Sequence, residues 1–195
     1  MMRSKILLVF CLVSAGTLGC AGAVKNMRAV DRVDTAPAPN EAVIVFLRPS
    51  GAGFGVQSAV FELDEAGPAR LVGIVAAKKK LAHRTTPGRH TYMVIGESAD
   101  FMAADLQPGR VYYSLVQVRM GVWKARFSLN PVHVMGRGEL GGWLADAQWV
   151  ATTQDSFTWA RDNAADVEQK RAEYWPKWMA KLPLDRPMLL PEDGQ

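Results

Sequence analysis

The chain has 195 residues, of which 49% are hydrophobic, so it can form an ordinary apolar core and is long enough for one domain plus appendages. Its formal charge of +4 comes from 23 Lys and Arg against 19 Asp and Glu. Two of those cations, Arg3 and Lys5, lie at the extreme amino terminus, and removing them leaves 21 against 19, or +2. So small an excess gives no support to a nucleic-acid-binding role.

The first 19 residues have the order of an export signal. Arg3 and Lys5 precede an apolar stretch over residues 6–13, which gives way to small residues. That stretch is less than half of the roughly 20 residues that a transmembrane helix needs, so we expect a cleaved signal peptide rather than a permanent membrane span.

The end of this signal resembles the bacterial lipobox, in which signal peptidase cleaves before a cysteine that is then diacylated. Gly19 and Cys20 match that motif, whereas Thr17 stands where leucine is usual. The resemblance implies a palmitate-type lipid on Cys20 and a membrane-anchored envelope protein, with the outer membrane favoured because Ala21, not Asp, follows the cysteine. Alternatively, cleavage after Ala23 at an A-x-A site would release a soluble secreted or periplasmic protein.

The cysteine content fits both routes. Cys11 lies inside the signal and Cys20 at the proposed anchor, and the chain has no third cysteine. The mature domain therefore has no internal disulfide and depends on core packing.

Residues 20–41 are predicted to be the lipidated amino terminus and a flexible tether. Pro37 and Pro39 discourage both helix and sheet there. A flexible chain of this length would hold the domain roughly 25 Å from its anchor.

Residues 42–135 are predicted to form an antiparallel β-sandwich of about seven to eight strands, because short apolar or alternating segments are separated by turn residues. Pro87-Gly88 and Pro108-Gly109 have the chemistry of type II turns. Gly121 suggests a tight hairpin before the last segment. The expected strands are 42–47, 58–63, 70–75, 81–85, 90–96, 101–106, 111–120 and 122–129.

Residues 136–195 are predicted to be a helical carboxy-terminal extension. Glycines mark a loop at its start, and apolar residues then recur at mostly helical spacing over 155–182, which predicts an amphipathic helix that Pro176 kinks or ends. This extension contains five of the six tryptophans, which either cover the sandwich or form a partner surface. They are Trp143, Trp149, Trp159, Trp175 and Trp178.

Residues 42–132 resemble the bacterial envelope lipoprotein family known as domain of unknown function 2846. The resemblance is carried by Val45-Phe46-Leu47-Arg48-Pro49-Ser50, by residues 61–64 and 71–74, by Pro87-Gly88-Arg89-His90-Thr91, by Gly109 with Tyr112-Tyr113, and by residues 129–132. It implies a secreted, lipid-anchored β-sandwich of unknown function and supplies no catalytic residues. The longer turn at 64–68, the run Lys78-Lys79-Lys80 and everything after Gly136 depart from the family pattern.

No sequence motif for catalysis, metal or cofactor is present. The three histidines, His83, His90 and His133, lack a second ligand at metal-site spacing. His83 and His90 are expected on adjacent strands across the Pro87 turn, as an ordinary cross-strand pair more than a metal site. No G-x-S-x-G elbow occurs. Serines, histidines and acids from distant segments remain free to converge in space.

Two further segments invite a functional interpretation. The loop 51–55 follows a strand but lacks the spacing, the lysine and the helix of a phosphate-binding loop, so it is expected to be a connecting loop with Phe54 as an apolar contact at its tip. Lys78, Lys79 and Lys80 are expected to protect an exposed strand edge, with contact to anionic lipid headgroups as the alternative.

Together these features predict a non-enzymatic, lipid-anchored envelope protein that binds an unknown ligand or another envelope protein and needs no cofactor. The alternative is a periplasmic hydrolase acting on cell-wall or lipid substrates. A deep pocket with converging His, Ser or acidic groups would favour the hydrolase, and a shallow aromatic surface would favour binding.

Overall fold

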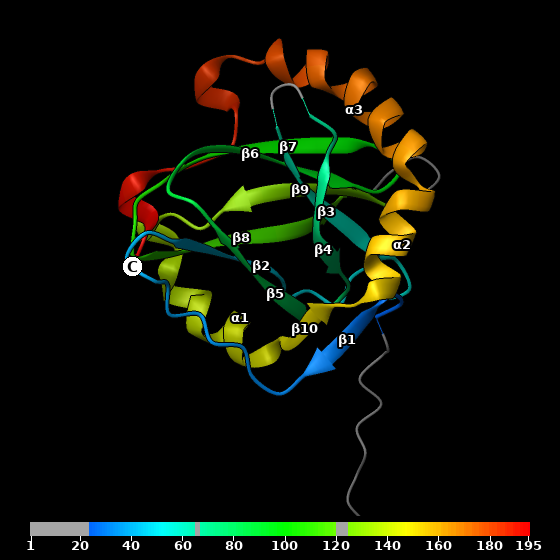
Figure 1. Ribbon diagram of the computed structural model, residues 1–195. Helices are drawn as coiled ribbons and strands as arrows, with labels where there is room; N and C mark the ends of the chain where they lie inside the picture. The colour runs from blue at the N-terminus through cyan, green and yellow to red at the C-terminus, as the bar shows by residue number, and fades with distance from the viewer. Residues whose placement is uncertain (1–23, 65–66, 120–124) are drawn as a thin grey trace, which may run out of the picture.

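The computed structural model describes residues 24–64, 67–119 and 125–195, which form a mainly β protein with two mixed sheets (Figure 1). The first sheet has the order β1 (Met27–Val30), β10 (Gln148–Thr152), β5 (Lys79–Thr85), β2 (Ala42–Arg48), β8 (Arg110–Arg119) and β9 (Arg126–Pro131). The second has the order β11 (Met188–Leu189), β7 (Ala99–Leu106), β6 (Gly88–Ile95), β3 (Ser58–Leu63) and β4 (Arg70–Val75).

The strand content departs from the expected antiparallel sandwich of seven to eight strands. Over the described ranges there are eleven strands, and three pairings are parallel: β2 with β8, β10 with β5, and β11 with β7. The prediction of a mainly β chain is confirmed, whereas the strand number and the purely antiparallel pairing are not.

A strand forms at each of the eight predicted positions, most with shifted ends. The turns at Gly88 and Gly109 have φ values of +114° and +71°, the positive region that a type II turn requires. The expected hairpin at Gly121 and the start of the last predicted strand lie outside the described residues. Regular alternation and turn chemistry therefore located these strands well.

The main core draws buried side chains from both sheets, including Phe46 of β2, Phe61 of β3, Phe101 of β7 and Phe127 of β9. A second cluster, on the opposite face of β2, contains Val43, Val45 and Leu47. Both faces of β2 are thus covered, which agrees with its unbroken apolar sequence.

The carboxy-terminal part contributes helices as well as strands. The α-helices are α1 (Leu140–Asp146), α2 (Gln154–Asp162) and α3 (Ala164–Met179), and the 3-10 helices are η1 (Val134–Glu139), η2 (Pro183–Asp185) and η3 (Pro191–Asp193). The single helix predicted over 155–182 is two helices that meet at Asn163, and Pro176 lies inside the second of them. Figure 1 shows α3 running along β6 and β7, where its apolar side contributes Val167 and Trp178 to the core.

No helix among the described residues is long and apolar enough to cross a membrane.

The predicted division at residue 135 is not reflected in the core. Val150 and Leu189 belong to the main core, β10 pairs with β5, and β11 pairs with β7. The carboxy-terminal part therefore adds a strand to each sheet and is continuous with the β domain.

The predicted tether is corrected over residues 24–41. β1 pairs antiparallel with β10, and Val24 is buried in the main core. Farther along, the Arg84 guanidinium donates to the carbonyl oxygens of Asp34 and Ala36, at 3.0 and 3.2 Å. Prolines prevent regular structure after β1, but the chain still packs on the domain because these carbonyls have a side-chain donor.

The prediction that the lysine run protects a strand edge is wrong, because β5 lies between β10 and β2 and is not an edge strand. Lys79 and Lys80 are buried, and burial lowers the pKa of both ammonium groups. Lys80 Nζ donates to the carbonyl oxygens of Leu144 and Ala147, and Lys79 Nζ lies 2.6 Å from Gln148 Oε1. These lysines hold the end of α1 and the residues after it against β5, and neither strand-edge protection nor lipid contact fits the burial of Lys79 and Lys80.

Candidate functional site

A polar cluster occupies one end of the space between the two sheets, where the inner faces change from apolar to polar. Val60 and Glu62 alternate inward along β3, and Leu81 and His83 do so along β5. The residues that meet there are Glu62 from β3, Arg70 from β4, His83 and Thr85 from β5, and His90 and Tyr92 from β6.

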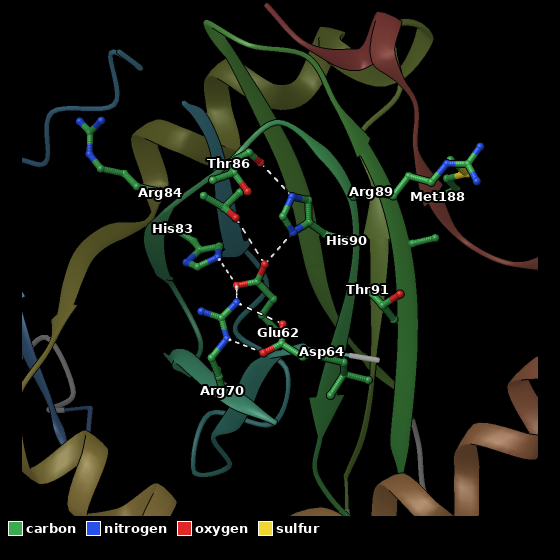
Figure 2. Close-up of a pocket in the computed structure, with 14 residues that line it drawn as sticks. Glu62, Asp64, Arg70, His83, Arg84, Thr86, Arg89, His90, Thr91 and Met188 are labelled. Atoms are coloured by element: carbon green, nitrogen blue, oxygen red, sulfur yellow. Dashed lines mark hydrogen bonds and ion pairs between the residues drawn. The ribbon is translucent and has the colours of Figure 1, made fainter. Parts of the chain in front are cut away.

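Glu62 is the centre of this cluster (Figure 2). Its side chain is only 5% exposed. Oε1 accepts hydrogen bonds from His90 Nδ1 at 2.7 Å and Thr85 Oγ1 at 3.3 Å. Oε2 lies 3.1 Å from Arg70 Nη2 and 3.3 Å from His83 Nε2. Four groups therefore surround one buried carboxylate, and both of its oxygens are engaged.

The surroundings of Glu62 keep it ionised. Burial alone would raise the pKa of its carboxyl group, but contacts with His83 and His90, together with the charge of Arg70, leave that pKa well below its ordinary value. A buried carboxylate is otherwise costly, so the charge persists because its neighbours compensate it.

His90 has an acceptor at each ring nitrogen. Nδ1 faces the Glu62 carboxylate, and Nε2 lies 2.8 Å from the carbonyl oxygen of Thr86. Neither partner can donate a hydrogen bond, so both nitrogens must carry a proton and the ring is an imidazolium. The hydrogen bond to Glu62 correspondingly raises the pKa of His90, against the opposing effect of burial.

Tyr92 supports the two histidines from the core side. Its ring stacks against His90 at a centroid distance of 6.2 Å, and contacts His83 edge-on at 5.7 Å and Phe46 at 5.4 Å. Tyr92 is fully buried, and burial raises the pKa of its hydroxyl well above the ordinary value. It therefore joins the polar cluster to the apolar core.

The cluster forms one wall of a pocket of about 860 Å³, which is large enough for a small organic ligand. Arg70, Arg84 and Arg89 also line it, and Figure 2 shows Arg89 beside Met188, away from Glu62. The lining residues include Thr85, Thr86 and Thr91 but neither serine nor cysteine. Among the described residues no group of three His, Cys, Asp or Glu could hold a metal ion.

The structure brings His83 and His90 together, but not as neighbours in one sheet as predicted. β5 and β6 belong to different sheets, and the two rings approach through Glu62 across the space between them. His133 is elsewhere, with Nδ1 2.8 Å from Asp193 Oδ2. Cys20, the predicted lipidation site, lies outside the described residues.

The five tryptophans of the predicted partner surface fall into two groups. Trp143 and Trp149 pack against the second cluster, with Lys80 Nζ 4.7 Å from the Trp149 ring centre. The other three belong to the main core or pack against it, and Trp175 stacks on Trp178 at 5.2 Å. These three are Trp159, Trp175 and Trp178.

Sequence reasoning missed Glu62 because its partners come from three other strands, β4, β5 and β6, in two sheets. The available signal was the alternation itself, since a glutamate on the inward side of a strand needs a buried partner.

No family model matches the chain, and no curated protein matches it. The resemblance to domain of unknown function 2846 therefore stays a prediction.

Proposed function

We propose that this chain is a lipid-anchored bacterial envelope protein that acts as a non-enzymatic binding module through the Glu62 pocket. The observation that carries the proposal is the bonding of Glu62 and His90. Both carboxylate oxygens and both imidazole nitrogens are engaged within the protein. Groups held in this way shape a pocket and fix its charge, whereas a general base needs a free lone pair directed at its substrate.

The anchor rests on the sequence. Gly19 and Cys20 end a segment with the order of an export signal, and residues 42–132 resemble a family of envelope lipoproteins. In this proposal the two mixed sheets are the β-sandwich that the resemblance implies, enlarged by the strands on either side of it.

The pocket lining favours a ligand with an anionic group, such as a carboxylate or a phosphate. The Glu62 charge is already matched by its neighbours, and the guanidinium groups of Arg70, Arg84 and Arg89 border the pocket. Arg89 has no ion-pair partner among the described residues. Arginine suits this role because its planar fork pairs with carboxylate and phosphate oxygens.

Calorimetric titration of the soluble domain with inorganic phosphate and citrate, and with uncharged trehalose as control, tests the ligand class. We expect the anions to bind and trehalose not to. Arg89→Gln should weaken anion binding about tenfold, the size of one lost charge-assisted hydrogen bond. Lys177→Gln, which removes a surface cation of α3, is the matched control and should change nothing. Equal binding of trehalose, or full anion binding by Arg89→Gln, would contradict this ligand class.

The anchor is tested separately by metabolic labelling with a fatty acid. Cys20→Ser should abolish the label and move the protein from the membrane fraction to the soluble fraction. Persistent labelling of that variant would refute the assignment of the lipid to Cys20.

One observation favours the alternative of a periplasmic hydrolase acting on cell-wall or lipid substrates. Glu62 contacts His83, and both border an open pocket. In that case His83 would exchange the proton, and a pocket threonine or a water molecule would attack the substrate. Hydrolysis of a chromogenic ester or a peptidoglycan fragment that His83→Ala abolishes, with folding intact, would decide for the hydrolase.

A further inference from the structure

The amino-terminal edge of the domain is fixed from Val24 onward. The Val24 carbonyl oxygen accepts a hydrogen bond from Met27 N at 3.1 Å. The Asn26 carbonyl oxygen accepts from Thr153 Oγ1 at 3.3 Å and also from Ser156 Oγ, at the start of α2. The position of the buried Val24 is therefore set by its packing on the domain and not by a tether.

The covalent link from Cys20 to Val24 is short. Three residues separate them, and four peptide units span at most about 14 Å. If Cys20 carries the lipid, as the proposed function holds, the surface around Val24 must lie at the bilayer. A tether reaching residue 41 would have set no such limit.

That surface presents exposed apolar side chains. Lys25, Val56 and Gln57 border one shallow hollow, and Phe157 directly follows Ser156, whose hydroxyl donates to the Asn26 carbonyl oxygen. Phe54, Val56 and Phe157 are 69%, 39% and 49% exposed. Phe54 is two residues from Val56, so it belongs to the same end of the molecule.

The loop that carries Phe54 is held by a buried cation. The fully buried Arg48 donates from Nη1 to the Val56 carbonyl oxygen at 2.7 Å, and from Nη2 to those of Ala52 and Gly53 at 2.6 and 2.8 Å. These bonds fix the backbone on both sides of Phe54. An aromatic side chain presented in this way loses little conformational freedom when it binds.

We propose that this end of the domain lies on a lipid surface, with Phe54 inserted at the headgroup level beside the acylated Cys20. Lys25 suits anionic headgroups, and an exposed aromatic adds a second membrane contact to the lipid chains. Glu62 lies six residues beyond Val56, or about 20 Å along an extended strand, so the pocket lies toward the end of the sheets farther from the bilayer.

A second exposed apolar patch does not compete for this role. Met179, Leu182 and Leu184 are exposed near η2, and the following β11 brings Met188 into the lining of the Glu62 pocket. Figure 1 shows η2 and β1 at opposite ends of the molecule. The short link from Cys20 therefore cannot place this patch at the membrane.

A thiol-coupled fluorophore tests the orientation. The acylated mature protein has no free cysteine, so Phe54→Cys and Leu184→Cys each introduce a single labelling site. Each variant is purified with its lipid, labelled with nitrobenzoxadiazole and bound to vesicles of phosphatidylethanolamine and phosphatidylglycerol. Flotation and unfolding temperature are measured on the same samples.

We expect the emission of the label at position 54 to shift to shorter wavelength when the protein binds vesicles. Lipids that carry a nitroxide should quench most of its fluorescence. The label at position 184, which replaces a fully exposed side chain, should behave as in water. Vesicle-bound protein with a water-like label at position 54 overturns the orientation and leaves the anchor intact. Protein that does not float with the vesicles refutes the anchor, and the orientation with it.

Discussion

Glu62 and Arg48 are both buried charges, and they lie toward opposite ends of the two sheets. Glu62 is surrounded by the side chains of His90, His83 and Arg70. Arg48 has no carboxylate within ion-pair distance among the described residues. Three backbone carbonyls and the face of Phe127, whose ring centre is 5.1 Å away, surround it instead.

The difference separates two uses of a buried charge. Backbone carbonyls do not titrate, so the Arg48 end keeps its electrostatics over the whole physiological pH range, although burial lowers the pKa of the guanidinium. The Glu62 end depends on the ionisation of Glu62 and His90. The pH-independent contacts of Arg48 suit a loop that must keep one conformation. The pH-dependent charges around Glu62 suit a pocket that binds ligands.

The largest effect is expected for Arg48→Ala. This change leaves three carbonyls without their donor and opens a void beside Phe127, at a cost of about 3 kcal/mol in the free energy of unfolding. Arg48→Lys keeps a cation that can bind one carbonyl, so it should reduce the free energy of unfolding less than Arg48→Ala does. It should still be less stable than the wild type, because an ammonium group lacks the fork that reaches several carbonyls. Denaturant unfolding at two pH values checks both, and the loss from Arg48→Ala should be the same at each.

A smaller loss, about 2 kcal/mol at neutral pH, is expected for Glu62→Gln, because it removes the buried carboxylate that holds His90 as an imidazolium, together with the hydrogen bonds which that carboxylate accepts. The His90→Gln change should cost a similar amount by stranding the carboxylate. The double variant should cost less than the sum of the two. Additive losses in this cycle would mean that the two groups do not interact.

The pH dependence of the wild type follows from the same pair. The pKa of Glu62 is lowered on folding, so its contribution is present above the ordinary carboxyl value of 4.5 and is lost as pH falls. The pKa of His90 is raised, so its contribution is present below the ordinary value of 6.5 and is lost as pH rises. Stability should therefore decline on both sides of this window, and Glu62→Gln should flatten the profile.

The smallest effect is expected for Arg70→Gln. Arg70 is 60% exposed and bridges Glu62 and Asp64, so solvent screens much of its interaction. A loss of no more than about 1 kcal/mol is expected. If Arg70→Gln reduced the free energy of unfolding as much as Glu62→Gln does, the solvent-exposed Arg70 would contribute more to the stability of the cluster than this account allows.

The strands could be predicted because their alternation is local. Residues 58–63 and 70–75 have the predicted bounds, and the positive φ of Gly88 and Gly109 follows from the Pro-Gly turns. β1, β10 and β11 could not be found in this way. They have only four, five and two residues, too few for alternation to show, and they become strands because neighbouring strands offer free backbone groups.

The candidate site could be predicted only as separate residues. The sequence identified His83 and His90 but not Glu62, which joins them, because contacts between sheets have no sequence period. Lys79 and Lys80 were misjudged for a related reason. Consecutive lysines usually indicate exposure to solvent, but here Lys80 donates to the carbonyl oxygens of Leu144 in α1 and of Ala147 directly after it.

The protonation of His90 is the most direct test, because it distinguishes a pocket of fixed charge from a site for proton transfer. Long-range proton–nitrogen NMR of the folded domain reports the state of both ring nitrogens across pH. We predict that both carry protons at pH 7 and that this imidazolium disappears in Glu62→Gln. A neutral His90 ring at pH 7, with one nitrogen unprotonated and open to the pocket, would contradict the account.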